Sequence, residues 1–67
     1  MNKEALHAKW HQVSGEAKRQ WGELTDDDIK FVDGSRKKLI GKLQERYSYS
    51  EEEAAREVDT WINKIKL

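Results

Sequence analysis

Apolar residues recur along this chain at the spacing of amphipathic helices. Between Lys3 and about Trp21 they are 4, 3, 4 and 4 positions apart, which places them in one stripe with polar residues opposite. Similar patterns predict a short helix from Thr25 to near Gly34, a third helix from Ser35 to about Tyr47 and a fourth from Glu51 to about Ile65. The apolar residues expected to face one another are Leu6, Trp10, Val13, Ala17, Trp21, Ile29, Val32, Leu39, Ile40, Leu43, Tyr47, Ala54, Val58, Trp61, Ile62 and Ile65. The sequence therefore predicts an all-α fold, a small four-helix domain.

Two of the predicted helices begin with a hydroxyl residue followed by three acidic residues. Thr25 precedes "DDD" and Ser50 precedes "EEE". The hydroxyl of such a residue accepts a hydrogen bond from the first turn of the helix, and the carboxylates favour the positive end of its dipole. Asp28 and Glu53 stand where a capping box needs its acidic member. We interpret both triplets as helix starts rather than metal sites, since a calcium loop needs alternating ligands and a glycine turn.

Gly15 interrupts the stripe of the first predicted helix. Glycine inside a helix costs about 1 kcal/mol relative to alanine. We expect a neighbouring helix to approach closely there, because a side chain at this position would be in the way.

The composition limits the class of protein. With 67 residues, the chain is expected to form one domain, residues 1–67. It has no cysteine, which excludes disulfides and thiolate zinc sites. Thirteen basic and thirteen acidic residues cancel, and neither a signal peptide nor a membrane span is evident. We expect a cytoplasmic protein without a cofactor, monomeric by preference, whose tryptophans (Trp10, Trp21 and Trp61) belong to the core rather than to a ligand platform.

Candidate catalytic and metal-binding residues are few. His7 and His11 are one helical turn apart, a spacing that can chelate zinc, copper or nickel, although two exposed imidazoles form a weak site. Ser14 lies one turn from His11, but no acidic residue is placed to orient that ring. We therefore expect no enzyme and interpret both histidines as surface residues, with metal binding as the alternative.

The predicted third helix is basic although the chain is neutral. Five basic residues against Glu45 give it a net charge of +4, and they are Arg36, Lys37, Lys38, Lys42 and Arg46. A glycine-containing hairpin that leads into a basic helix can bind DNA phosphates. Asp33 and the acidic triplet at 26–28 would repel phosphate. Non-specific nucleic-acid binding by Lys37, Lys38, Lys42 and Arg46 is kept as an alternative function.

Several motifs together resemble one known family. "WGELTDDD" at 21–28, Gly34, "LIGKLQERY" at 39–47 and A-x-x-E-V-x-x-W at 54–61 are similar to the CsbD-like family of small bacterial stress-response proteins. The resemblance implies a four-helix domain of two roughly orthogonal helical hairpins. It also implies a non-enzymatic protein induced in general stress, of unestablished molecular activity. We expect such a protein to act by its abundance or through contact with an unknown protein partner. Many relatives carry glycine where this chain has Ser48, so a left-handed helix cap is less expected there.

Overall fold

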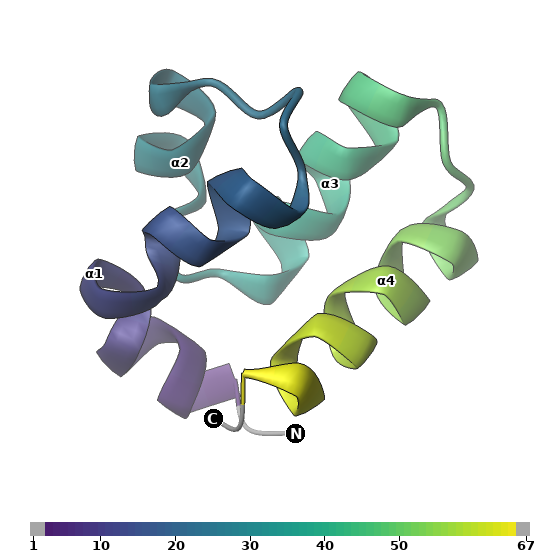
Figure 1. The fold of residues 1–67 in the computed structure, drawn as a ribbon. Coiled ribbons are helices and arrows are strands. Elements are labelled where there is room, and N and C mark those ends of the chain that lie inside the picture. The colour runs from purple at the N-terminus through teal and green to yellow at the C-terminus, as the bar shows by residue number, and fades with distance from the viewer. Residues whose placement is uncertain (1–2, 66–67) are drawn as a thin grey trace.

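Four helices account for most of the computed structural model, which describes residues 3–65, with side chains from Ala5 onward. The helices are α1 (Lys3–Gln20), α2 (Asp26–Val32), α3 (Arg36–Tyr47) and α4 (Glu51–Lys64) (Figure 1). Each lies within two residues of its predicted bounds, and the described part of the chain contains no strand. The prediction of an all-α, four-helix fold is confirmed.

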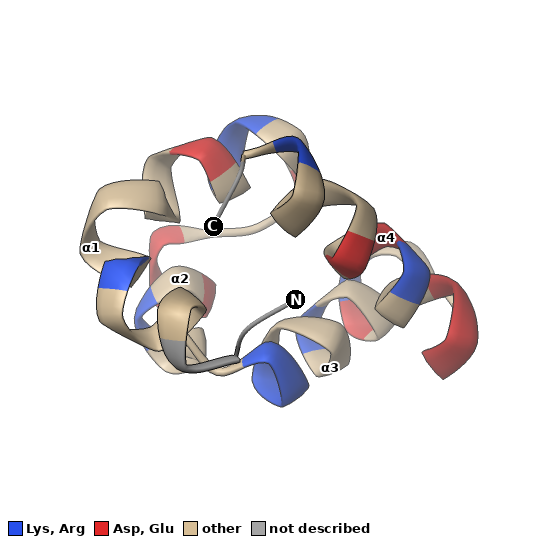
Figure 2. Cartoon of the chain, turned by 90° about the horizontal axis from the view of Figure 1, so that it is seen from below, with Lys and Arg blue, Asp and Glu red and all other residues tan. Residues whose placement is uncertain are grey.

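The hydroxyl residues cap the helices as expected. Thr25 Oγ1 accepts a hydrogen bond from the Asp28 backbone N–H at 3.0 Å, and the Asp28 carboxylate accepts one from the Thr25 N–H at 3.0 Å. Ser50 and Glu53 form the same reciprocal pair at the start of α4, at 3.1 and 2.9 Å. These bonds hold the pKa of the Glu53 carboxyl below its usual value. Figure 2 shows acidic residues gathered at the start of α4.

One core joins the four helices, and α3 packs against both α2 and α4. The edge of Trp21 meets Trp61 of α4, with ring centroids 5.2 Å apart. Trp10 of α1 is also buried, and its Nε1–H donates to the Ile29 carbonyl of α2 at 3.2 Å. The tryptophans therefore belong to the core, as the sequence predicts. The buried apolar residues are Leu6, Trp10, Ala17, Trp21, Leu24, Val32, Leu39, Ile40, Leu43, Ala54, Val58, Trp61 and Ile62.

The glycine that permits a close approach is Gly34, not Gly15. A Cβ added at Gly34 would lie 2.6 Å from the Cα of His7 and 3.1 Å from the Cβ of Trp10, whereas one at Gly15 would meet nothing within 4 Å. The prediction for Gly15 is wrong because Gly15 lies on the exposed side of α1, where no other helix packs against it. Gly34 has a φ of 81°, a left-handed conformation in which L side chains are strained. The turn between α2 and α3 can rest on α1 only with glycine there.

The expectation against a left-handed cap at Ser48 is also wrong. Ser48 has a φ of 57° and a ψ of 30°, and its N–H donates to the Gln44 carbonyl at 3.1 Å. Asp33 ends α2 in the same way, with a φ of 44°. The hydrogen-bonding needs of the last helical turn override the steric preference of a non-glycine residue at both positions.

Candidate functional site

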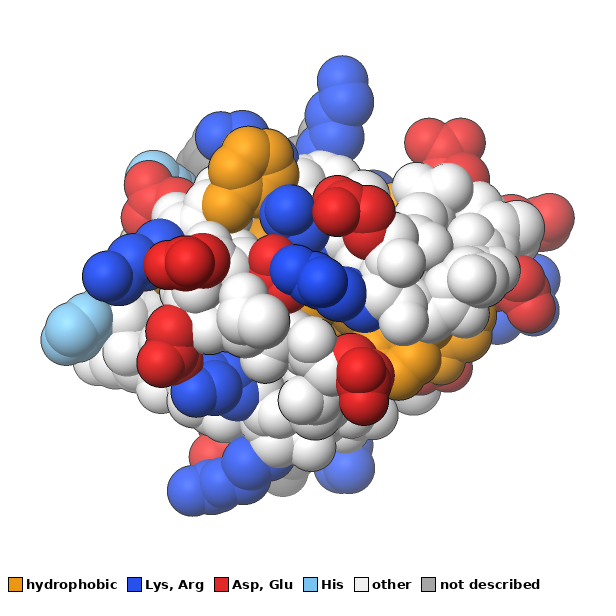
Figure 3. Space-filling view, turned by 90° about the horizontal axis from the view of Figure 1, so that it is seen from above, with side chains coloured by type: hydrophobic (Ala, Val, Ile, Leu, Met, Phe, Trp, Pro, Cys, Tyr) orange, Lys and Arg blue, Asp and Glu red, His pale blue; other side chains and the backbone are white. Residues whose placement is uncertain are grey.

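Phe31 stands out on the surface where α2 meets α3. It is 53% exposed and is the one exposed large hydrophobic residue among those described. The ammonium groups of Lys38 and Lys42, both from α3, lie 5.1 and 4.8 Å from the centre of its ring. We call these three residues the Phe31 patch. Figure 3, which views the molecule from above, shows hydrophobic side chains on this face next to basic ones. Cation–π contacts of this kind stabilise an exposed site by about 0.5–1 kcal/mol.

A buried carboxylate holds the basic side of α3 against α2. Asp28 is only 3% exposed, and its two oxygens accept hydrogen bonds from Nε and Nη2 of Arg46 at 2.8 and 2.9 Å. Lys42 Nζ lies 3.5 Å from the same carboxylate and 3.3 Å from Glu45 Oε2. We call Asp28, Lys42 and Arg46 the Asp28 cluster. The Arg46 guanidinium, more than any other group, holds the pKa of the Asp28 carboxyl far below its usual range.

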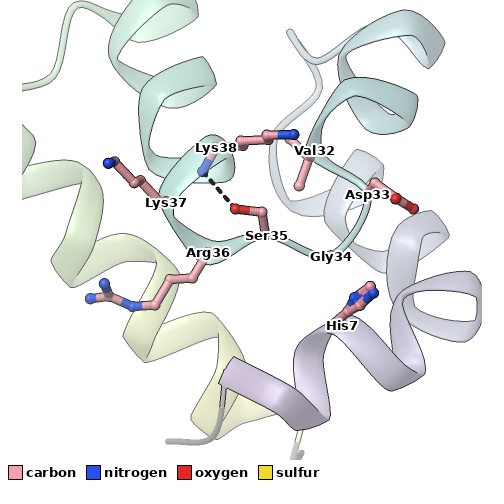
Figure 4. A pocket seen from close by; sticks show the side chains of 8 residues that line it. All are labelled: His7, Val32, Asp33, Gly34, Ser35, Arg36, Lys37 and Lys38. Atoms are coloured by element: carbon pink, nitrogen blue, oxygen red, sulfur yellow. Dashed lines mark hydrogen bonds between the residues drawn. The ribbon is translucent and has the colours of Figure 1, made fainter.

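The four basic residues proposed for nucleic-acid binding do not form one free surface. Arg46 and Lys42 are paired within the Asp28 cluster. Lys38 contacts Phe31, while Lys37 is exposed and points to the other side of α3 (Figure 4). Among the described residues, neither Lys37 nor Lys38 has a carboxylate oxygen within 4.0 Å of its ammonium. Lys42 and Arg46 thus stabilise the fold, whereas the ammonium groups of Lys37 and Lys38 remain exposed to solvent.

Arg36, at the first turn of α3, also has a structural partner. Its Nε and Nη2 donate to the two oxygens of Asp59 on α4 at 2.9 and 3.0 Å. Figure 4 shows Arg36 pointing from α3 toward the neighbouring helix and away from His7. The paired geometry ties the start of α3 to α4, and the guanidinium lowers the pKa of the Asp59 carboxyl.

His7 and His11 lie on the exposed side of α1 and line one hollow together with Ser14 and Asp33. His7 also lines the neighbouring pocket at Gly34 (Figure 4). Within the part of the chain that the structure describes, no group of three or more histidine, cysteine or acidic side chains could hold a metal ion. Metal binding by the histidine pair stays the untested alternative to ordinary surface histidines, and a zinc titration followed through the histidine NMR signals would test it.

Sequence reasoning missed Phe31 and the pairing of Asp28 with Arg46. Phe31 could have been found, because it falls between the buried positions Asp28 and Val32 and outside the apolar stripe of α2. The pairing of Asp28 with Arg46 could not have been found in the sequence, because eighteen positions separate the two residues.

None of the described helices combines the length and the apolar character that crossing a membrane requires.

Comparison with known proteins places this chain among small bacterial proteins. The model of the family described as CsbD-like matches residues 4–56. The UPF0337 protein YjbJ of Escherichia coli O6:H1 is 49% identical over 61 residues, which cover 91% of this chain and 88% of that protein. The UPF0337 protein PA4738 of Pseudomonas aeruginosa is 45% identical over 65 residues, which cover 97% of this chain and 100% of that protein. The span that the family model matches, residues 4–56, contains the positions of the Phe31 patch and of the Asp28 cluster.

Proposed function

Because the chain belongs to the CsbD-like family, we propose that it is a small, non-enzymatic, cytoplasmic stress-response protein. It acts as a single domain, through contacts with a protein partner or through its abundance, rather than by turning over a substrate. The stress role comes from what the family resemblance implies. The non-catalytic part of the proposal depends on which polar side chains are paired with one another within the fold.

The observation that supports a non-catalytic role is that several charged side chains are paired with one another and stabilise the fold. Arg46 pairs with the buried Asp28, and Arg36 pairs with Asp59. Ser50 and Glu53 cap α4. A catalytic site needs a nucleophile or base held by an orienting partner. Among the described residues, neither histidine forms a hydrogen bond with Ser14 or Asp33, the polar groups that line the same hollow.

The stress role is tested by measuring transcript and protein levels through salt, heat and stationary-phase stress. We expect both to rise several-fold in at least one of these conditions. Flat levels in all three would contradict the proposal. A pull-down from stressed cells, comparing the wild type with a Phe31→Ala variant, would then show whether a protein partner depends on the exposed ring.

Nucleic-acid binding by α3 is the second candidate function. The observation that favours it is the charge of Lys38, which no described carboxylate pairs with, beside the exposed ring of Phe31. Lys42 and Arg46 would contribute less than the sequence suggests, because Asp28 already pairs with both. A gel-shift titration at about 50 and 200 mM salt tests it, since phosphate contacts weaken steeply over that range. No shift at the lower salt concentration would exclude this function.

A further inference from the structure

We propose that the Phe31 patch binds single-stranded nucleic acid, with a base stacked on the ring of Phe31 and a neighbouring phosphate at the ammonium group of Lys38. The inference rests on the second candidate function, nucleic-acid binding by α3. The inference adds that the nucleic acid is single-stranded and that Phe31 is the residue that distinguishes a single strand from a duplex.

Phe31 supplies the stacking surface. More than half of its surface is open to solvent, although every other large hydrophobic side chain among those described is buried or partly buried. Exposing a phenylalanine leaves apolar area in water that the fold does not use. Aromatic rings placed in this way are the platforms on which proteins stack the bases of single strands, because every base has a π face.

Lys38 supplies the charge. Its ammonium lies 5.1 Å from the ring centre, and no described carboxylate neutralises it within 4.0 Å. The adjacent Lys42 pairs with Asp28 and Glu45, and Arg46 pairs with Asp28, so Lys38 is the cation over the ring that no described carboxylate pairs with. A phosphate that follows a stacked base would therefore find an ammonium group that is not already paired with a carboxylate.

The composition of the patch favours nucleic acid over a protein partner. Lysine is depleted from the centres of protein–protein interfaces, which are built from clusters of apolar and aromatic residues. Phe31 has lysines over its ring and stands alone as an exposed large hydrophobic residue among those described. A duplex is a poorer ligand than a single strand, because its base faces are stacked on one another and hidden from the ring.

Asp27 opposes the ligand. It lies one helical turn before Phe31 on α2, is exposed, and has no cation within 4.0 Å among the described residues. Residues four apart on a helix are neighbours, so its carboxylate repels a phosphate that approaches the ring. The Asp27→Asn variant should therefore bind tighter than the wild type, by about twofold to threefold at low salt.

Fluorescence anisotropy with a labelled single strand of about 16 nucleotides, and with the matching duplex, tests the proposal at about 50 mM salt. We expect the 67-residue chain to bind the single strand about tenfold tighter than the duplex. Phe31→Ala should weaken single-strand binding about tenfold, and Phe31→Tyr, which keeps the π face, should leave it nearly unchanged. Lys38→Gln should reduce the salt dependence of single-strand binding by about 0.7 in slope.

Lys64→Gln is the matched control, because Lys64 is an exposed lysine in the last turn of α4. It should bind as the wild type does. Phe31 is exposed, so its variants should keep the far-ultraviolet circular dichroism of the wild type, which separates loss of binding from loss of fold.

These experiments distinguish the single-strand proposal from the broader proposal that α3 binds nucleic acid. Binding that prefers duplex, or that survives Phe31→Ala, would overturn the single-strand proposal and leave nucleic-acid binding by α3 standing. No binding of either ligand at low salt would overturn both. Loss of single-strand binding in Phe31→Ala and its retention in Phe31→Tyr supports the proposal.

Discussion

Gly34 is the residue whose replacement should disturb the fold most directly. In Gly34→Ala the new methyl group would lie 2.6 Å from the Cα of His7, and alanine would have to adopt a φ of 81°. We expect a loss of about 3 kcal/mol in the free energy of unfolding, measured by urea denaturation. Gly15→Ala is the control and should gain up to about 1 kcal/mol, because nothing lies near that position. Equal stability of Gly34→Ala and the wild type would contradict the close contact between this turn and α1.

Asp28 should dominate the response to acid. Its pKa is lowered in the folded state, so its contribution to stability is present above the ordinary carboxyl value of 3.8 and is lost as the pH falls below it. Asp28→Asn should lose about 2–3 kcal/mol at pH 7, since the Arg46 guanidinium loses its anionic partner. The difference from the wild type should shrink as the pH falls toward 2.

The measurement is a series of urea denaturations between about pH 7 and pH 2. Asp27→Asn serves as the control on the same helical turn, and its exposed side chain should change stability by less than about 0.5 kcal/mol. A difference between Asp28→Asn and the wild type that stays constant with pH would show that the carboxylate does not act through its charge.

Helix ends show how far a local pattern determines an element. Thr25 and Ser50 cap their helices as the sequence predicts, because the partners of each cap are three residues away. Contacts between elements are different. Arg46 pairs with Asp28, and Arg36 with Asp59, across separations of 18 and 23 residues, so a charge pattern along α3 cannot tell which side chains remain free. The four helices and the all-α class were therefore predictable from local signals, whereas the candidate surface depended on tertiary pairing.

The C-terminus of α3 retains strain that glycine would remove. Ser48 holds a left-handed conformation that glycine adopts without steric cost. We expect Ser48→Gly to raise the free energy of unfolding by about 0.5–1 kcal/mol and the melting temperature by a few degrees, measured by circular dichroism. Ser50→Ala is the contrasting variant and should lose about 1 kcal/mol with the cap of α4. A lower melting temperature for Ser48→Gly would mean that the serine side chain contributes more than its strain removes.

At the scale of the whole molecule, one shared core predicts one unfolding transition. Trp10 and Trp61 lie on α1 and α4, Trp21 follows α1 directly, and all three are buried together. Tryptophan emission should therefore shift to longer wavelength at the same urea concentration at which helical circular dichroism is lost. Two separated midpoints would show that part of the molecule unfolds independently.

The burial of Asp28 means that the fold and the surface of this protein respond differently to a rise in salt concentration. Mobile ions screen exposed charges far more than buried ones, so a rise in ionic strength leaves the pairing of the buried Asp28 with Arg46 largely intact. Contacts made by the solvent-facing Lys38 weaken under the same conditions. If the Phe31 patch binds single-stranded nucleic acid as proposed, high salt would release that ligand while the protein stays folded.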